Sequence, residues 1–227
     1  MVDQTRQRKL STILAMDVVN YTAKMGNDEE GTLEQLAKLR SIIEAVVEKQ
    51  QGRIFNTAGD AFMIEFASPV EAVTAAINIQ KKVSIENEGI ASDQRMEFRM
   101  GINMGDIIIE GDNLFGEGVN VAARLEGIAP PGGICVSEMI QTVIEGKIKI
   151  EFVDLGPQNL KNVEKPVRAY YLELEPGSGK AKRYKAPSQN SHINPFKWAT
   201  GVMGLVLIIG VYFFLQNESS DLKLQNL

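Results

Sequence analysis

The sequence has 227 residues, 44% of them hydrophobic and 23% charged, which suits a globular protein with one sizeable domain and additional segments. Its formal net charge of −5 gives no support to nucleic-acid binding. The single cysteine, Cys135, excludes an intramolecular disulfide and a Cys-rich metal site. The single histidine, His192, excludes His-rich metal sites and His-dependent catalytic triads. Any catalysis would therefore rest on carboxylates, amides, arginines and a hard metal ion.

The first expected element is a strand over residues 10–18, followed by a short helical turn after Thr22 that "GNDEEG" interrupts. Apolar periodicity then predicts helices over residues 33–47, 69–88 and 119–128. Further strands are expected in "GRIFNTAGDAFMIEF" (two, around a tight turn), "MEFRMGINMGDIIIEGD" (two, joined near Gly105), "GICVS", "IKIEFVDLG" and "VRAYYLELE". This order predicts an α+β fold, a ferredoxin-like β-α-β-β-α-β unit with extra strands, with helices on one face of a mostly antiparallel sheet.

The composition changes near residue 176. Residues 1–175 are expected to form the folded domain, 176–196 a basic flexible linker, 197–216 a transmembrane helix and 217–227 a short non-cytoplasmic tail. Residues 198–215 carry no charge, and a helix of that length spans roughly 27 Å, close to the thickness of a bilayer's hydrocarbon core. Five basic and no acidic side chains between residues 177 and 197 predict a cytoplasmic linker and domain. The N-terminus does not resemble a signal peptide, because Asp17 interrupts its apolar stretch too early.

Asp17 is the first candidate functional residue, because a carboxylate in an apolar strand is costly to bury without a partner. Asp60, at the predicted hairpin turn, is its expected neighbour. Two carboxylates raise each other's pKa unless a cation lies between them, and Mg²⁺ or Mn²⁺ prefers such oxygen ligands. The alternative is that Asp17 caps the following turn and that Asp60 is only a turn residue.

The residues after Asp17 indicate a phosphate site. With Thr22 as a helix N-cap, the backbone N–H groups of Asn20, Tyr21 and Thr22 would be free to bind phosphate oxygens. Two carboxylates and a phosphate cradle together suggest metal-assisted nucleoside-triphosphate chemistry.

"GEGVNVAARLEG" contributes a third element. Asn120 and Arg124 are four residues apart and so share one helix face. A guanidinium is always charged and suits the charge that develops during phosphoryl transfer. Alone, this pattern also fits a solvated helix face.

Together these motifs resemble the class III nucleotidyl cyclase catalytic domain, the family of adenylate and guanylate cyclases. The similarity runs from about residue 12 to residue 172 and is carried by "ILAMDVVNYT", "TAGDAFMIEF", "RMGINMGD", "LFGEGVNVAARLEGIAPPGGICVS" and "NLKNVEKPVRAYYLEL".

The resemblance implies that Asp17, Asp60 and the backbone carbonyl of Val18 hold two divalent cations, Mg²⁺ or Mn²⁺. It implies that residues 20–22 bind the β- and γ-phosphates. The 3′-hydroxyl of the substrate would attack the α-phosphorus in line and expel pyrophosphate.

The resemblance also implies that Asn120 orients the ribose and that Arg124 stabilises charge at the α-phosphate. In this family the metal aspartates and the Asn/Arg pair come from different subunits, so a head-to-tail homodimer with two sites is expected. Lys161 is a weaker candidate for triphosphate contact, with a plain surface lysine as the alternative.

The sequence departs from the family at the two base-recognition positions. Adenylate cyclases usually have Lys four residues before the second metal aspartate and Asp or Thr seven before the ribose asparagine, whereas guanylate cyclases have Glu and Cys. Here these positions are Asn56 and Asn113. An amide both donates and accepts hydrogen bonds, so either purine could be bound. We favour ATP, with GTP and pyrimidine triphosphates left open.

Two other functions are weighed. "AGDAF" is similar to the hairpin motif of diguanylate cyclases, but that family lacks the Asn120/Arg124 element. The unusual base-recognition pair also allows a non-catalytic module that binds nucleotide or only dimerises.

Overall fold

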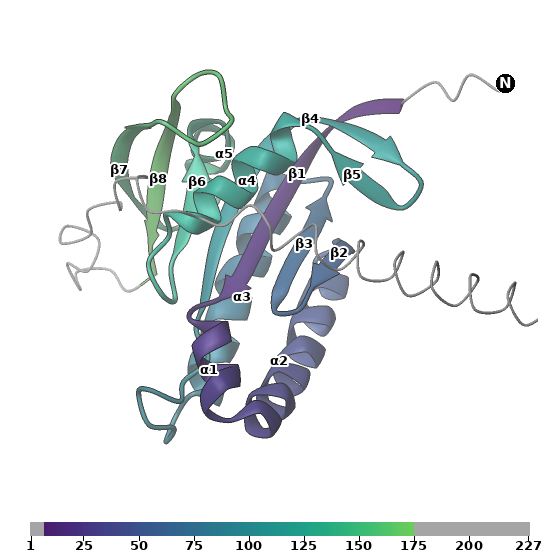
Figure 1. Cartoon of the computed structure of the whole chain (residues 1–227). Coiled ribbons are helices and arrows are strands. Elements are labelled where there is room, and N and C mark those ends of the chain that lie inside the picture. The colour runs from purple at the N-terminus through teal and green to yellow at the C-terminus, as the bar shows by residue number, and fades with distance from the viewer. Residues whose placement is uncertain (1–6, 175–227) are drawn as a thin grey trace, which may run out of the picture. The chain divides into compact units, whose positions relative to one another are not determined.

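The computed structural model describes residues 7–174 (Figure 1). The predicted linker, transmembrane helix and tail lie outside these described residues. Among residues 7–174, none of the helices is both long enough and apolar enough to cross a bilayer. The elements are, in chain order, β1 (Gln7–Val18), α1 (Tyr21–Asn27), α2 (Glu29–Lys49), β2 (Arg53–Ala58), β3 (Ala61–Phe66), α3 (Pro69–Glu86), β4 (Phe98–Glu110), β5 (Asn113–Phe115), α4 (Glu117–Gly127), β6 (Ile134–Ser137), α5 (Glu138–Ile144), β7 (Glu151–Gln158) and β8 (Val167–Glu173).

One sheet organises the described residues, with strand order β2-β3-β1-β4-β6-β8-β7 and β5 paired to β4. All the pairings are antiparallel except β4 with β6, which is parallel. The β1-α2-β2-β3-α3-β4 segment forms the predicted β-α-β-β-α-β unit, to which β5, β6, β7 and β8 are added. The expectation of an α+β fold with a mostly antiparallel sheet is confirmed.

Helices cover both faces of the sheet, so the expectation of helices on one face was wrong. Leu14 and Met16 of β1 face the larger core, which includes buried residues of α2 and α3. Ile13 and Ala15 face the other side, where Ala122 of α4 packs. Figure 1 shows α4 crossing in front of β1 and β4, with α3 behind the sheet. The physical reason is that β1 is apolar on both faces, and a strand of this kind needs cover on both.

β4 is a single strand of 13 residues rather than two strands joined near Gly105. Its glycines mark close approach of α4 and not a turn. A Cβ on Gly101 would lie 2.1 Å from the backbone nitrogen of Glu126, and one on Gly105 would lie 3.0 Å from Cα of Gly118. The missing side chains let α4 lie directly against the strand.

Several helix boundaries differ from expectation. α2 begins at Glu29, within "GNDEEG", because the Asp28 carboxylate accepts a hydrogen bond from Gly31 N at 3.0 Å and caps the helix. α1 begins at Tyr21 with Asn20 as its N-cap, so Thr22 is not the cap. The short elements β5 and α5 were not predicted.

Cys135 is fully buried in β6. Burial, together with the nearby Glu126 carboxylate, raises the pKa of its thiol to about 12.

Candidate functional site

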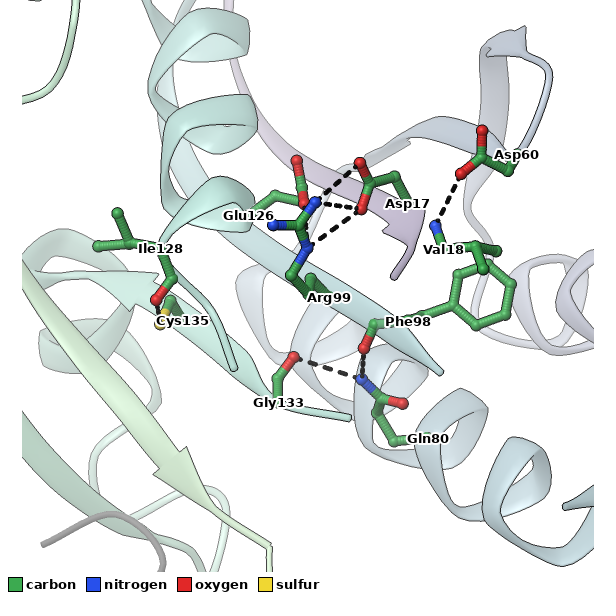
Figure 2. A network of polar contacts seen from close by, with 10 residues as sticks. All are labelled: Asp17, Val18, Asp60, Gln80, Phe98, Arg99, Glu126, Ile128, Gly133 and Cys135. Atoms are coloured by element: carbon green, nitrogen blue, oxygen red, sulfur yellow. Dashed lines mark hydrogen bonds and ion pairs between the residues drawn. The ribbon is translucent and has the colours of Figure 1, made fainter. Parts of the chain in front are cut away.

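Asp17 is the next-to-last residue of β1 and lies directly opposite Arg99 of β4. The Nη2 of Arg99 donates to both carboxylate oxygens of Asp17, at 2.9 and 3.1 Å, and its Nε donates to Oδ1 at 3.3 Å. Both side chains are 29% exposed. The cross-strand partner of the anomalous carboxylate is therefore an arginine, which the sequence analysis did not single out (Figure 2).

Glu126 of α4 completes this cluster. Its Oε1 lies 3.2 Å from Nε of Arg99, and its side chain is 14% exposed. Burial raises the pKa of Glu126 well above its usual range, and the neighbouring carboxylates of Asp17 and, to a smaller extent, Asp60 raise it further against the opposing effect of Arg99. Two carboxylates, those of Asp17 and Glu126, thus contact a single guanidinium.

Asp60 lies at the turn between β2 and β3, where Gly59 has a positive φ of 62°. Its Oδ2 accepts a hydrogen bond from the backbone N–H of Val18 at 3.1 Å, so Asp60 reaches the residue next to Asp17 (Figure 2). Arg40 of α2 supports the turn, because its Nη2 donates to the Gly59 carbonyl at 3.2 Å. Arg40 is not among the residues predicted from the sequence.

The donor set around Asp17 and Asp60 fits a hard divalent cation. Both supply carboxylate oxygens, and the carbonyl of Val18 belongs to the residue that Asp60 contacts. Among residues 7–174, however, the structure forms no cluster of three or more His, Cys, Asp or Glu side chains arranged to hold a metal.

The start of α1 lies immediately after β1. Val19 N donates to the Glu97 carbonyl, and the first N–H groups to donate within the turn are those of Ala23 and Lys24, both to the Asn20 carbonyl. The N–H groups of residues 20–22 therefore precede the hydrogen-bonded part of the helix, as the phosphate-cradle prediction requires. Burial, and next the charge of Asp60, raise the pKa of Tyr21.

α4 presents the predicted Asn/Arg pair on a different face from Glu126. Asn120 is exposed, and Arg124 follows one helical turn later. Nε of Arg124 donates to the backbone carbonyl of Lys161 at 3.3 Å, which brings these two predicted residues together. Residues two apart on a helix do not face each other, so Arg124 is directed away from the region where Glu126 contacts Arg99.

The predicted base-recognition residues are both exposed. Asn56 lies on β2, opposite Met63 of β3, just after a bulge at Phe55. Asn113 begins β5, opposite Glu110 of β4.

The residues that the sequence analysis missed carry signals of the same kind as Asp17. Arg99 is a charged residue inside the apolar stretch "EFRMGI", and Glu126 follows the apolar periodicity of its helix. Each could have been singled out as a charge needing a partner. The contact between Arg99 and Glu126 could not be predicted, because it depends on how α4 packs against β4.

Comparisons with known proteins agree on one family. Residues 4–174 match the family model described as "Adenylate and Guanylate cyclase catalytic domain". A protein of Rhizobium meliloti (strain 1021) named "Putative adenylate cyclase 3" is 40% identical over 171 residues, which are 75% of this chain and 29% of that protein. The chain therefore spans about three tenths of this relative's length.

Solved structures give the same result. An adenylate/guanylate cyclase/hydrolase from Silicibacter pomeroyi superposes with a TM-score of 0.70 at 34% identity, over 74% of this chain and 98% of that one. The adenylyl cyclase CyaB from P. aeruginosa superposes with a TM-score of 0.65 at 25% identity, over 74% and 95% of the two chains.

Proposed function

Because the chain belongs to the adenylate and guanylate cyclase catalytic domain family, we propose that it converts a nucleoside triphosphate, with ATP favoured, into the 3′,5′-cyclic nucleotide and pyrophosphate. The observation that carries this proposal is the hydrogen bond from Val18 N to Asp60, which brings Asp60 to the residue next to Asp17 at the end of β1, beside the start of α1. Carboxylate oxygens beside free backbone N–H groups suit a metal–triphosphate ligand.

The proposed cofactors are two divalent cations, Mg²⁺ or Mn²⁺, held by Asp17, Asp60 and the carbonyl of Val18. When bound, they would supply Lewis-acid activation of the 3′-hydroxyl and of the α-phosphate. Arg99 would orient the Asp17 carboxylate by donating hydrogen bonds to it, and Glu126 would in turn orient Arg99 through their ion pair.

The triphosphate would bind the N–H groups of residues 20–22, and Asn120 and Arg124 would hold the ribose and the α-phosphate. Lys161 is a further candidate for triphosphate contact. The orientation of Arg124 away from the Asp17 cluster supports a site completed by the Asn120/Arg124 pair of a second copy, in a head-to-tail homodimer.

ATP is favoured over GTP on two grounds. The relative with 40% identity is named an adenylate cyclase, and Asn at positions 56 and 113 is less foreign to adenylate than to guanylate cyclases. Two amides offer both donors and acceptors, so discrimination between purines is expected to be looser than with a charged pair.

We also propose that residues 197–216 form one membrane-spanning helix with the catalytic domain on the cytoplasmic side. The uncharged run over 198–215 and the basic linker before it support this topology. Alkaline carbonate extraction of cell membranes would leave the chain in the pellet, whereas release into the supernatant would refute the anchor.

The deciding experiment is product identification. The full chain is incubated with Mn²⁺ and all four ribonucleoside triphosphates in competition, and the products are analysed by mass spectrometry. Predominant 3′,5′-cyclic AMP is the expected result, and predominant 3′,5′-cyclic GMP would reverse only the choice of substrate. A cyclic dinucleotide would favour the diguanylate cyclase alternative, and the absence of any cyclic product would favour the non-catalytic module.

A further inference from the structure

Arg53, at the start of β2, joins three segments of the chain. Its Nε and Nη2 donate to Oε2 of Glu65 on β3, at 3.3 and 3.0 Å. Its Nη1 donates to the backbone carbonyl of Asp112 at 2.9 Å. That carbonyl belongs to the peptide unit that links Asp112 to Asn113, so the guanidinium fixes the backbone at the start of β5.

Glu65 is held from its other side as well. Its Oε1 accepts a hydrogen bond from the Ser11 hydroxyl at 2.7 Å and lies 2.6 Å from Nζ of Lys9. The Glu65 side chain is 9% exposed, whereas that of Arg53 is 46% exposed. A fixed carboxylate with several partners orients the more exposed guanidinium, which alone would be free to move. We call Arg53, Glu65 and the Asp112 carbonyl the hairpin clamp.

A bulge in β2 brings Arg53 and Asn56 to the same face of the sheet. Arg53 pairs with Glu65 and Asn56 pairs with Met63, with the register shift between Ile54 and Asn56. Directly opposite residues share a face, and Glu65 and Met63 are two apart on β3. Without the extra residue, Arg53 and Asn56 would point to opposite faces.

The β4–β5 hairpin packs against this same region. Leu114, next to Asn113, is buried in one core cluster with Met63, the strand partner of Asn56. The clamp therefore ties the hairpin to β2 and β3 on the face of the sheet where Leu114 and Met63 are buried.

We propose that Arg53 is a positioning residue for substrate selection, which holds the backbone of Asn113 at a fixed distance from Asn56. This inference rests on the proposed function, in which these two asparagines recognise the base. A planar guanidinium can bind the Glu65 carboxylate and the Asp112 carbonyl at once, whereas a lysine ammonium on its flexible stem cannot match both geometries. Arg53→Lys should therefore keep the charge but lose the positioning.

The test uses the full chain in four forms: wild type, Arg53→Ala, Arg53→Lys and the control Arg168→Ala. Arg168 is an exposed arginine paired with Asp154 between β7 and β8, so its removal deletes an ion pair far along the sheet from β2. Hydrogen exchange of residues 111–114 is measured first, because it does not depend on activity. Dissociation constants for ATP, GTP and inorganic tripolyphosphate follow, and then kcat and KM for each nucleotide.

We expect faster exchange of the hairpin in both Arg53 variants and no change in Arg168→Ala. Affinity for the preferred nucleotide should fall about tenfold in Arg53→Ala. The variant loses the hydrogen bond from the charged guanidinium to the Asp112 carbonyl, so the hairpin that carries Asn113 must be ordered when the nucleotide binds. The ratio between the affinities for ATP and GTP should become smaller as well. Tripolyphosphate has no base, so its affinity should stay at the wild-type value.

Unchanged exchange at residues 111–114 would overturn the clamp. Faster exchange with an unchanged ATP-to-GTP affinity ratio would overturn the positioning role. A loss of tripolyphosphate affinity as large as the loss of ATP affinity would also overturn it, because it would indicate a merely structural effect. If wild type yields no cyclic product, the proposed function fails, but the exchange rates and dissociation constants still decide this inference.

Discussion

Arg99 and Asp17 lie directly opposite each other on β4 and β1, and the guanidinium donates to both oxygens of the carboxylate. The same guanidinium lies against Glu126 of α4, which is the more buried of the two acids it contacts. One arginine thus joins the sheet to the helix that carries Asn120 and Arg124.

Arg99→Ala is expected to destabilise the protein. It would leave Asp17 and the largely buried Glu126 side by side without their cation, at a cost of about 2 kcal/mol in the free energy of unfolding. Urea denaturation followed by circular dichroism measures this. Arg168→Ala, which breaks an exposed ion pair, should leave the urea midpoint near that of wild type.

The double variant Arg99→Ala/Glu126→Gln sharpens this test, because it removes the stranded charge together with its partner. It should be more stable than Arg99→Ala alone. Equal stability of Arg99→Ala and wild type would contradict the role assigned to the cluster.

Gly101→Ala is expected to displace α4. The added Cβ would lie 2.1 Å from Glu126 N and 2.2 Å from the Ala122 carbonyl oxygen, and backbone atoms cannot rotate away. A loss of about 2–3 kcal/mol in unfolding free energy and a fall in cyclase activity should follow, because the helix carries Arg124.

Gly26→Ala is the matched control for this substitution. It introduces the same methyl group into α1, where nothing lies within 4 Å, and should leave stability unchanged or slightly higher. If both alanine variants unfold at the wild-type urea concentration, α4 does not depend on the close approach at Gly101.

Glu65 should contribute to the loss of stability in acid. Burial raises the pKa of Glu65, but hydrogen bonds from Lys9, Ser11 and Arg53 outweigh burial and hold it below the ordinary value of 4.5. A carboxyl group whose pKa is lower in the folded than in the unfolded protein stabilises the fold at pH values above the unfolded-state pKa. This contribution disappears as the pH falls through the folded-state pKa.

Thermal denaturation between about pH 6 and pH 3 tests this prediction. Glu65→Gln should be less stable than wild type at the upper end, and the difference should shrink towards the lower end. A difference that is constant over the whole range would show that the Glu65 charge does not matter.

Asp17→Asn and Asp60→Asn should each lose binding of Mn²⁺, since each removes a proposed anionic oxygen ligand. The electron paramagnetic resonance signal of free Mn²⁺, titrated with protein and ATP, gives the affinity without relying on turnover. Asp154→Asn, on exposed β7, changes the net charge identically and should bind like wild type. Wild-type affinity in either Asp17→Asn or Asp60→Asn would remove that residue from the metal site.

Local sequence signals were sufficient for part of the fold and of the site. Asp17 and Asp60 were singled out because a carboxylate in an apolar strand and one after a turn glycine are visible in a few neighbouring residues. The hairpin, the helix after Pro69 and the α+β class were predicted correctly from periodicity and turn residues.

The remaining features depend on contacts between distant segments. Gly105 was interpreted as a turn, yet it lies within β4 where Gly118 of α4 approaches. Arg99 was passed over because its pairing with Asp17 follows from a register between strands about eighty residues apart in the chain. The apolar residues on both faces of β1 indicate that each face is covered, but which helix covers the second face follows from packing between distant segments.

The most direct test of the account mixes two inactive variants. Asp17→Ala lacks a proposed metal ligand, and Arg124→Ala lacks the guanidinium proposed for the α-phosphate, so each full-length variant should form cyclic nucleotide at least about a hundredfold more slowly than wild type. Co-expressed, the two should form heterodimers in which one site keeps both groups, and cyclic nucleotide measured by mass spectrometry should recover to a sizeable fraction of the wild-type rate. A mixture that stays as inactive as its components, although heterodimers are isolated through two different affinity tags, would contradict the shared nucleotidyl cyclase site.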